Sequence, residues 1–363
     1  MKIAQIAPLA ESCPPLLYGG TERIVSYLTE ELVAQGHEVT LFASGDSETS
    51  AELVACTDVA LRLNPKVIDQ IPHLMIMLDR VRRCADDFDV LHFHIDLIHF
   101  PVIREFAEKT VTTLHGRLDL PDLLPFYSAF PDVPLASISY HQRLPMPPKA
   151  NWAGNVYNAI PKDILPFSES AKGGYLAFLG RISPEKRPDR AIEIAARAGL
   201  PLLIAAKIDK ADQCYWRDVI QPMIMSNPGI EYIGEINEQQ KANLLGSALA
   251  LLFPIDWPEP FGLAMIEAMA CGTPVIAFPS GSVSEVIDAG ETGFVVSSVG
   301  EAVEALSHVE KLDRTKVRAR FEARFGVERM ARDYLKIYQD LTEAVQQPLA
   351  RTQRNPAGLR IIA

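Results

Sequence analysis

Apolar residues recur along this chain with two periods, and the two periods alternate. Short runs rich in Val, Ile and Leu are typical of buried strands, whereas apolar positions three or four residues apart mark one face of a helix. In the first half the strand-like runs are residues 2–7, 38–44, 51–56, 90–95, 111–114 and 135–139, and the clearest helical stretches are 21–36, 67–86 and 99–107. Thr21 is the expected N-cap of the first helix, and Gly36 is the residue expected to end it.

The alternation breaks once and then starts again. Residues 157–174 are rich in Pro, Ser and Gly, which is typical of a boundary between domains. Beyond it the predicted strands are residues 175–180, 201–206, 230–234, 249–254 and 275–278, and the predicted helices are 187–198, 211–226, 238–247 and 327–345. We therefore expect two α/β domains with parallel sheets, at residues 1–165 and 170–326, then a long terminal helix at 327–345 and a flexible tail at 346–363.

Composition narrows the class of protein. The 363 residues are enough for two buried cores, and 48% hydrophobic with 22% charged residues is ordinary for a globular protein. A net charge of −11 argues against a broad surface for nucleic acid or anionic membrane. The five cysteines are scattered, and no apolar run is long enough to span a bilayer. The first predicted strand starts at residue 2, so we expect no signal peptide. We expect a soluble, cytoplasmic chain with reduced thiols.

The stretch with the clearest chemical content is residues 254–272. It reads P-I-D-W-P-E-P-F-G-L-A-M-I-E-A-M-A-C-G and follows an apolar run. Leu263, Ile266 and Ala270 recur at helical spacing, and Gly272 stands where a helix C-terminal glycine is expected. The order is therefore strand, loop, helix and strand, which places a helix N-terminus at the carboxyl edge of a parallel sheet, where ligands bind.

Two carboxylates, Glu259 and Glu267, flank the start of this helix with seven residues between them. The free N–H groups near Phe261, Gly262 and Leu263 would face an anion, and the helix rises roughly 7–8 Å between Gly262 and Glu267. A phosphate held between two hydroxyl-bearing rings fits that layout. The spacing alone also permits a less specific interpretation, in which one glutamate complements the helix dipole and the other is solvated.

The whole segment 259–277, E-P-F-G-L-A-M-I-E-A-M-A-C-G-T-P-V-I-A, resembles the E-x7-E signature of retaining glycosyltransferases of family 4. The resemblance implies the α/β GT-B fold, with two Rossmann-like domains facing each other across a cleft and a C-terminal helix crossing back to the first domain. It also implies that Glu267 holds the ribose of a nucleotide-sugar donor, that Glu259 holds hydroxyls of the donor sugar, and that the backbone at residues 261–263 contacts the donor.

Residues 180–188, G-R-I-S-P-E-K-R-P, end the first strand of the second domain. Arg181 and Lys186 are two cations at a turn before a helix; they either serve as ordinary surface charges or converge on a diphosphate. The segment resembles the family's pyrophosphate-binding element, which implies that both side chains stabilise the departing diphosphate. Lys207 stands at the end of the next strand, where many members of the family carry a further basic residue.

In the first domain, Gly19 and Gly20 open the first helix, and His115 closes a strand in T-T-L-H-G, residues 112–116. Paired glycines let a backbone approach an anion at a helix N-terminus, although a plain loop-to-helix entry is the alternative. A His at the carboxyl edge of a parallel strand faces the ligand crevice, with a structural His as the alternative. The family carries G-G-x-E and T-x-H-G at such places, which implies contacts with the donor phosphates or the acceptor and with the reacting sugar.

His92, His94 and Asp96 alternate along another strand and are expected to share one face. Three side chains on one strand point in nearly parallel directions, which does not suit a closed coordination shell, so we expect no metal site. For His94 and Asp96 the histidine-bearing strand ends of the family imply a role on the acceptor side.

These expectations describe a metal-independent, retaining hexosyltransferase that needs no cofactor and uses a nucleotide-diphosphate sugar, with UDP-glucose as the first candidate. His115, Arg181, Lys186 and Glu259 are the expected catalytic residues. No second carboxylate stands out as a nucleophile, which favours transfer on one face of the sugar with the leaving phosphate taking the acceptor's proton. Two alternatives stay open, a sugar-nucleotide epimerase on the same fold and a sugar-nucleotide-binding protein without activity. The acceptor and the oligomeric state are left open by the sequence.

Overall fold

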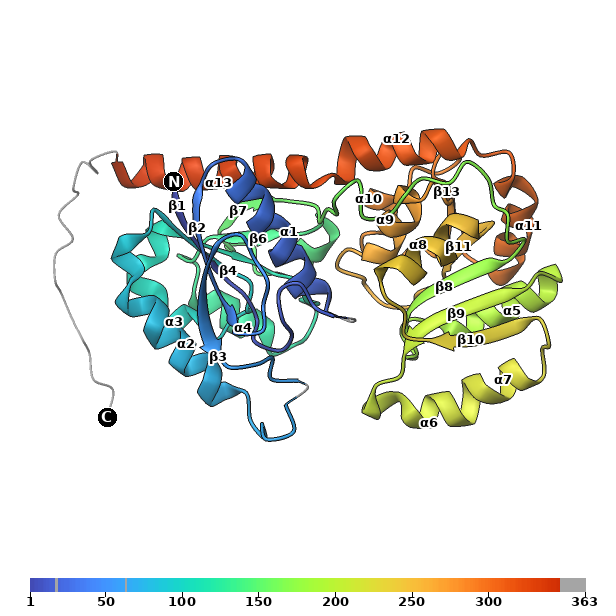
Figure 1. Cartoon of the computed structure of the whole chain (residues 1–363), viewed down its shortest axis with the longest axis horizontal. Helices are drawn as coiled ribbons and strands as arrows, with labels where there is room; N and C mark the ends of the chain where they lie inside the picture. Colours follow the sequence, from blue (N-terminus) through green and yellow to red (C-terminus); the bar gives the residue numbers. More distant parts are fainter. Residues whose placement is uncertain (17–18, 63, 347–363) are drawn as a thin grey trace.

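The computed structural model describes residues 1–16, 19–62 and 64–346, and it forms two α/β halves side by side (Figure 1). Each half is built on a parallel sheet. The strand order is β3-β2-β1-β4-β5-β6-β7 in the first sheet and β10-β9-β8-β11-β12-β13 in the second. In both, the first strand lies inside the sheet and later strands extend to either side, which is the doubly wound arrangement of Rossmann-like domains. The expected fold class is confirmed.

The predicted strands agree with the observed ones to within two residues. The first sheet contains β1 (Lys2–Ile6), β2 (Glu38–Ser44), β3 (Glu52–Thr57), β4 (Val90–Phe93), β5 (Thr110–Thr113), β6 (Leu135–Ser137) and β7 (Trp152–Asn155). The second contains β8 (Leu176–Arg181), β9 (Leu202–Lys207), β10 (Ile230–Gly234), β11 (Ala250–Phe253), β12 (Val275–Ala277) and β13 (Gly293–Val295). The edge strands β7 and β13 were not predicted, because both are short and largely half-buried and neither is a continuous apolar run.

Helices are less regular than predicted. They are α1 (Gly20–Ala34), α2 (Ile71–Arg83), α3 (Phe100–Ile103), α4 (Leu123–Ala129), α5 (Pro188–Ala198), α6 (Gln213–Tyr215), α7 (Gln221–Met225), α8 (Glu238–Ser247), α9 (Leu263–Ala270), α10 (Val283–Val286), α11 (Val299–Val309), α12 (Arg314–Phe325) and α13 (Val327–Gln346). The helix predicted at 211–226 is interrupted by a π turn at Trp216–Ile220, which ends two residues before Pro222, a residue with no N–H to donate. The helix predicted at 99–107 is α3 followed by a 3₁₀ turn, Arg104–Lys109. No helix in the described part of the chain is both long and apolar enough to cross a bilayer.

The terminal helix α13 returns to the first half and packs on its sheet (Figure 1). Met330, Ala331, Tyr334 and Tyr338 on one face of α13 are buried in the same core as residues of β1 and α1. Burial of such a face is the main reason that a long amphipathic helix is stable in a protein. The tail predicted beyond α13 lies outside the described residues.

Two segments pass between the halves, and they lie side by side. Ile160, after β7, forms a parallel bridge with Gly326, between α12 and α13. Arg318 of α12 donates to the carbonyl oxygens of Lys162 at 2.8 Å and Leu165 at 3.0 Å. These contacts hold the two passing segments together.

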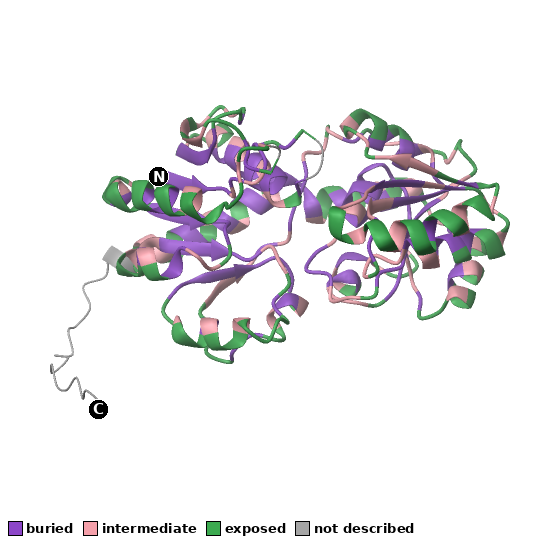
Figure 2. Ribbon diagram, turned by 90° about the horizontal axis from the view of Figure 1, so that it is seen from below, coloured by how far each residue is buried: buried purple, intermediate pink, exposed green. Residues whose placement is uncertain are grey.

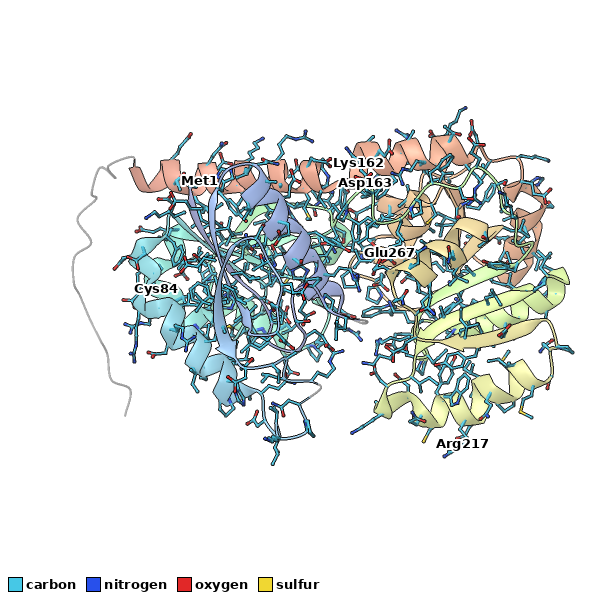
Figure 3. All side chains as sticks on the ribbon, viewed as in Figure 1. Met1, Cys84, Lys162, Asp163, Arg217 and Glu267 are labelled. Carbon is cyan, nitrogen blue, oxygen red and sulfur yellow. The ribbon has the colours of Figure 1, made fainter. Side chains whose placement is uncertain are left out.

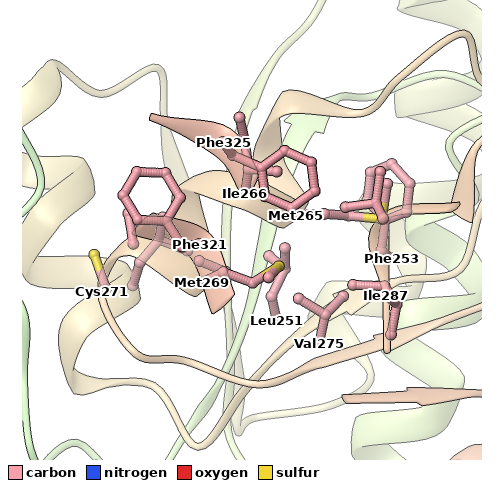
Figure 4. Close-up of a cluster of buried hydrophobic side chains, with 14 of the residues drawn as sticks. Leu251, Phe253, Met265, Ile266, Met269, Cys271, Val275, Ile287, Phe321 and Phe325 are labelled. Carbon is pink, nitrogen blue, oxygen red and sulfur yellow. The ribbon is translucent and has the colours of Figure 1, made fainter. Parts of the chain in front are cut away.

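In the second half, a dense apolar core anchors α9. Met265, Ile266 and Met269 are fully buried and lie in one cluster with Phe321 and Phe325 of α12 (Figure 4). Buried residues concentrate inside each half, on the sheets and on the inner faces of the helices (Figure 2). Because close-packed cores resist displacement, the groups at the start of α9 have a rigid support.

Candidate active site

A cleft of about 480 Å³ lies between the two halves, at the carboxyl ends of both sheets. Its first wall is formed by the start of α1 and the segment after β5, and its second wall by the ends of β8 and β9 and the start of α9. Glu267 lies on the side of the second half that faces the first (Figure 3). The predicted residues that line the cleft are Gly19, Gly20, His115, Arg181, Lys186, Glu259, Phe261, Gly262, Leu263 and Glu267.

The start of α1 corrects one prediction, because its N-cap is Gly19 and not Thr21. Gly19 has a φ of 154°, and a Cβ there would lie 2.8 Å from the Cβ of Pro15, so glycine is required. The chain therefore enters the helix before Thr21, and no side chain caps it. The first N–H groups of α1 are left for a ligand in the cleft.

The start of α9 also has a glycine N-cap and no capping side chain. Its N-cap, Gly262, is left-handed with a φ of 81°. A Cβ on Gly262 would lie 2.7 Å from Met265 and 2.9 Å from Phe253. Across the cleft, a Cβ on Gly20 would lie 3.5 Å from Leu263, so the two uncapped helix starts approach each other. Gly272 is left-handed at the end of α9, as predicted.

Glu259 is buried and pairs with two groups of its own half. Lys186 donates a short hydrogen bond to its Oε2, and the indole Nε1 of Trp257 donates to the same oxygen at 2.9 Å. The Lys186 ammonium also lies 4.9 Å from the centre of the Trp257 ring, within cation–π range. The carboxylate and the ammonium are thus fixed side by side at the second wall, and both are oriented before any ligand arrives.

The backbone around Glu259 is held by a turn that the sequence analysis missed. Ser282 donates from its backbone N–H to the Glu259 carbonyl at 3.0 Å and from its hydroxyl to the Phe261 carbonyl at 2.7 Å. The Ser280 hydroxyl donates to the Trp257 carbonyl. A Cβ on Gly281 would lie 2.2 Å from the Glu259 carbonyl oxygen. The small residues S-G-S after β12 were the available sequence signal for this close packing.

Arg181, at the end of β8, is surrounded by carboxylates. Its guanidinium donates to Glu185 at 2.7 Å and to Asp209 at 3.4 Å, and it lies 3.9 Å from Asp212. Lys207, at the end of β9, pairs with Asp209 at 2.9 Å and also lines the cleft. Arg181, Lys186 and Lys207 therefore put three cations along one wall, which suits an anionic ligand.

Glu267 is buried, and its partner is a residue that the sequence analysis missed. Lys241 of α8 donates to Glu267 Oε1 at 2.6 Å and to Glu238 Oε1 at 3.0 Å. Burial disfavours the ammonium, but the Glu267 and Glu238 carboxylates outweigh it and raise the pKa of Lys241. Glu238 also pairs with Arg23 of α1 across the cleft. The spacing of Glu238 and Lys241 on one helix face was the only sequence signal for this network.

His115 lines the first wall, and burial lowers its pKa to about 3. Its Nε2 lies 2.9 Å from Nδ1 of His94, so a hydrogen bond to His94 orients the His115 ring. His92 and His94 do lie together, with ring centres 4.0 Å apart. Asp96 departs from the predicted alternation, because its left-handed φ of 54° turns the chain and leaves it exposed. Neither His94 nor Asp96 is among the residues that line the cleft.

The chain matches two family models that together take in most of it. Residues 162–324 match the model described as glycosyl transferases group 1, and residues 18–158 match glycosyltransferase family 4. A phosphatidyl-myo-inositol mannosyltransferase from Mycobacterium leprae is 26% identical over 352 residues, which cover 89% of this chain and 90% of that protein.

Solved structures share the fold over almost the whole chain. A sucrose-phosphate synthase from Thermosynechococcus elongatus superposes with a TM-score of 0.77 at 19% identity, covering 95% of this chain and 100% of that one. The Anabaena protein HepE, solved in complex with UDP and glucose, gives a TM-score of 0.67 at 17% identity, covering 95% and 99%. The matched model over residues 162–324 confirms the family resemblance of segment 259–277, and the solved structures share the fold. The chain belongs to the glycosyltransferases of group 1 and family 4.

Proposed function

We propose that this glycosyltransferase is a retaining, metal-independent hexosyltransferase that uses a nucleotide-diphosphate sugar. One observation carries the proposal: a single cleft combines the cations Arg181, Lys186 and Lys207, the buried carboxylates of Glu259 and Glu267, and two uncapped helix starts, one from each half of the molecule. Cations and free N–H groups suit a diphosphate, and carboxylates suit the hydroxyls of ribose and hexose.

The order of groups along the second wall suggests how the donor lies. Glu267, on the second turn of α9 and held by Lys241, would accept hydrogen bonds from the ribose. The N–H groups near Gly262 and Leu263, with Arg181 and Lys186, would hold the diphosphate. Glu259, anchored by Lys186 and Trp257, would accept from hydroxyls of the hexose. His115 on the opposite wall would then face the reacting sugar.

Catalysis would come mainly from charge stabilisation. The negative charge on the leaving diphosphate grows as the glycosidic bond breaks, and fixed cations in a closed cleft stabilise that charge more than the ground state. We place no covalent nucleophile in the cleft. The leaving phosphate takes the proton of the acceptor hydroxyl, and the acceptor attacks from the same face, which retains the configuration.

For the hexose we propose glucose, with UDP-glucose as the donor. HepE was solved in complex with UDP and glucose, which supports testing this donor first, and the mannosyltransferase relative makes a mannose donor the second candidate. We propose the cytoplasm as the compartment, because all five cysteines are unpaired.

The test is a donor panel with the purified full chain. UDP-glucose, UDP-galactose, GDP-mannose and UDP-N-acetylglucosamine are each incubated with a small-molecule extract, and mass spectrometry is used to find products heavier by one hexose. We expect UDP release with UDP-glucose and a new hexosylated product. Interconversion of donors without acceptor would instead favour an epimerase. Donor binding without turnover for any donor would favour a binding protein.

A further inference from the structure

A line of buried polar side chains connects the terminal helix α13 to the cleft. His115 Nε2 lies 2.9 Å from His94 Nδ1, and His94 Nε2 lies 2.9 Å from the amide oxygen of Gln5 on β1. The amide nitrogen of Gln5 donates to the Tyr338 hydroxyl at 3.1 Å. One chain of contacts thus joins the segments that follow β5 and β4 to β1 and α13.

The line continues beyond Tyr338. The Tyr338 hydroxyl lies 2.6 Å from His92 Nδ1, and His92 Nε2 lies 2.7 Å from the Thr113 hydroxyl. Thr113 in turn lies 2.9 Å from the Tyr334 hydroxyl of α13. Gln5, His92, Thr113 and both tyrosines are 0% exposed, so water does not replace any of these partners. An unpaired polar atom in such a place is costly, which ties the members to one another.

The direction of donation along this line is set by Gln5. A histidine ring and a hydroxyl can each donate or accept, whereas an amide has one fixed acceptor and one fixed donor end. Burial lowers the pKa of His94 well below its ordinary value, so this ring is neutral and carries one N–H. The Gln5 oxygen faces His94, so Nε2 of His94 donates and its Nδ1 must accept. His115 must therefore donate from Nε2.

We propose that the Gln5 amide, held in place by Tyr338, fixes His115 as the Nε2–H tautomer, so that His115 offers Nδ1 to the cleft as a hydrogen-bond acceptor. His115 Nδ1 has no partner among the residues that the structure describes. Gln5, His94 and Tyr338 are then positioning residues, and the terminal helix sets the hydrogen-bonding character of a group in the cleft 223 positions away in the sequence (338 − 115).

The consequence for the reaction rests on the proposed function. An acceptor nitrogen binds a sugar hydroxyl, which donates, and it disfavours a phosphate oxygen, which also accepts. If the direction of donation were reversed, His115 would carry its proton on Nδ1. It would then present an N–H to the cleft, which would favour a phosphate oxygen. The tautomer of His115 therefore favours a hydroxyl of the hexose, and not an oxygen of the diphosphate, next to His115.

The tautomer is measured directly in the full chain without ligand. The protein is labelled with ¹⁵N-histidine, and long-range proton–nitrogen correlation spectra give the protonated nitrogen of each ring. The His115 and His94 signals are assigned from spectra of His115→Gln and His94→Gln. We expect a single Nε2–H tautomer for His115 near neutral pH. An Nδ1–H tautomer, or an average of the two, would overturn the proposal.

Two variants test the role of the line. Gln5→Leu removes the amide, and Tyr338→Phe removes the partner that orients it; in both we expect His115 to lose its single tautomer. Thr112→Val is the matched control, because Thr112 lies 2.7 Å from His99 Nε2 and takes no part in the line. A single Nε2–H tautomer retained in both variants would contradict the role of Gln5. If Gln5→Leu does not fold, the wild-type and Tyr338→Phe spectra decide.

Kinetics give a second measurement for the same variants. We expect turnover in Tyr338→Phe to fall about tenfold, as for one lost hydrogen bond in the transition state, while the affinity for UDP alone stays unchanged. A merely structural role would weaken both together. The spectra report on the free protein, so a chain without transferase activity would contradict the proposed function without altering the tautomer result.

Discussion

Arg23 of α1 and Glu238, the first residue of α8, form an ion pair across the cleft. The Arg23 side chain is 9% exposed and that of Glu238 is 31% exposed. Lys241 donates to the same oxygen of Glu238 and also to Glu267. One carboxylate therefore links the first half to the residue that we assign to the ribose.

The first prediction concerns this link. Glu238→Gln should weaken the attraction between the halves, because the amide carries no charge to pair with Arg23 or Lys241. We expect the donor KM to rise roughly three- to tenfold, equivalent to about 1 kcal/mol. We expect the two halves to close on a bound nucleotide, and the Arg23–Glu238 pair to favour the closed form. Small-angle scattering with UDP present should therefore show a larger radius of gyration for Glu238→Gln than for the wild type.

Glu105→Gln is the matched control for Glu238→Gln. Glu105 pairs with Arg82 inside the first half, and both side chains are about half-exposed, at 52% and 49%. This variant should change neither the radius of gyration nor the KM. An unchanged radius and KM in Glu238→Gln would mean that the cross-cleft pair does not contribute to closure.

The second prediction concerns the cations of the second wall. Arg181→Ala and Lys186→Ala should each lower kcat by roughly a hundredfold, because the charge on the leaving diphosphate loses a fixed partner. In Arg181→Ala the loss also leaves Glu185, Asp209 and Asp212 close to the diphosphate without this counter-charge. Circular dichroism should remain native. Arg197→Ala, at an exposed arginine paired with Glu193, should retain full activity. Near-normal turnover in both test variants would refute the assignment.

The third prediction separates the two carboxylates. Glu267→Gln should weaken binding of UDP alone by about 1–2 kcal/mol, because a charged hydrogen bond to the ribose becomes a neutral one. Glu259→Gln should leave UDP affinity unchanged and remove the additional affinity of the UDP-sugar. Isothermal titration calorimetry measures both, with Glu231→Gln as a control at an exposed position. If UDP alone binds much worse to the Glu259 variant, the two roles are reversed.

The fourth prediction is that transfer needs no metal ion. Arg181, Lys186 and Lys207 line the cleft beside the uncapped start of α9, so the protein itself supplies the positive field that a divalent ion gives other enzymes. Turnover should be the same in EDTA and in magnesium. A loss of activity in EDTA that magnesium or manganese restores would contradict this prediction.

The fifth prediction concerns stability below neutral pH. Burial lowers the pKa of His92, His94 and His99 well below the ordinary value of 6.5. The unfolded chain therefore binds protons that the folded chain does not, and the free energy of unfolding falls as the pH drops below 6.5. Each such histidine should cost about 1.4 kcal/mol near pH 5.5. Chemical denaturation across this pH range measures the slope.

His99→Gln tests that explanation by removing one titrating ring. Below pH 6.5, the slope of the unfolding free energy against pH should then correspond to about one proton fewer taken up on unfolding. Thr112→Val removes a hydrogen bond of His99 but keeps the ring, so it should lower stability and leave the slope unchanged. An unchanged slope in His99→Gln would mean that the folded chain already binds that proton.

The sequence by itself determined what depends on near neighbours along the chain. Strand and helix periods predicted both sheets, because side-chain direction repeats every two residues in a strand and about every 3.6 in a helix. Segment 254–272 also predicted its own site: Glu259, Gly262 and Glu267 lie within a few residues, so the geometry of one loop and one helix sets their positions. Arg181 and Lys186 line the same cleft because their segment follows β8, and parallel strands of one sheet end at the same edge.

Only the tertiary structure decided which distant partners orient these groups. Arg23 and Glu238 are 215 residues apart, and Gln5 and Tyr338 are 333 apart. No period or local motif relates such pairs, because their contact depends on how the two halves and α13 pack. Thr21 was predicted as a cap from its residue type, but the conformation of Gly19, packed against Pro15, started the helix earlier. The sequence therefore determined the chemistry that the cleft carries, and packing decided the partner, the orientation and the protonation of each group in it.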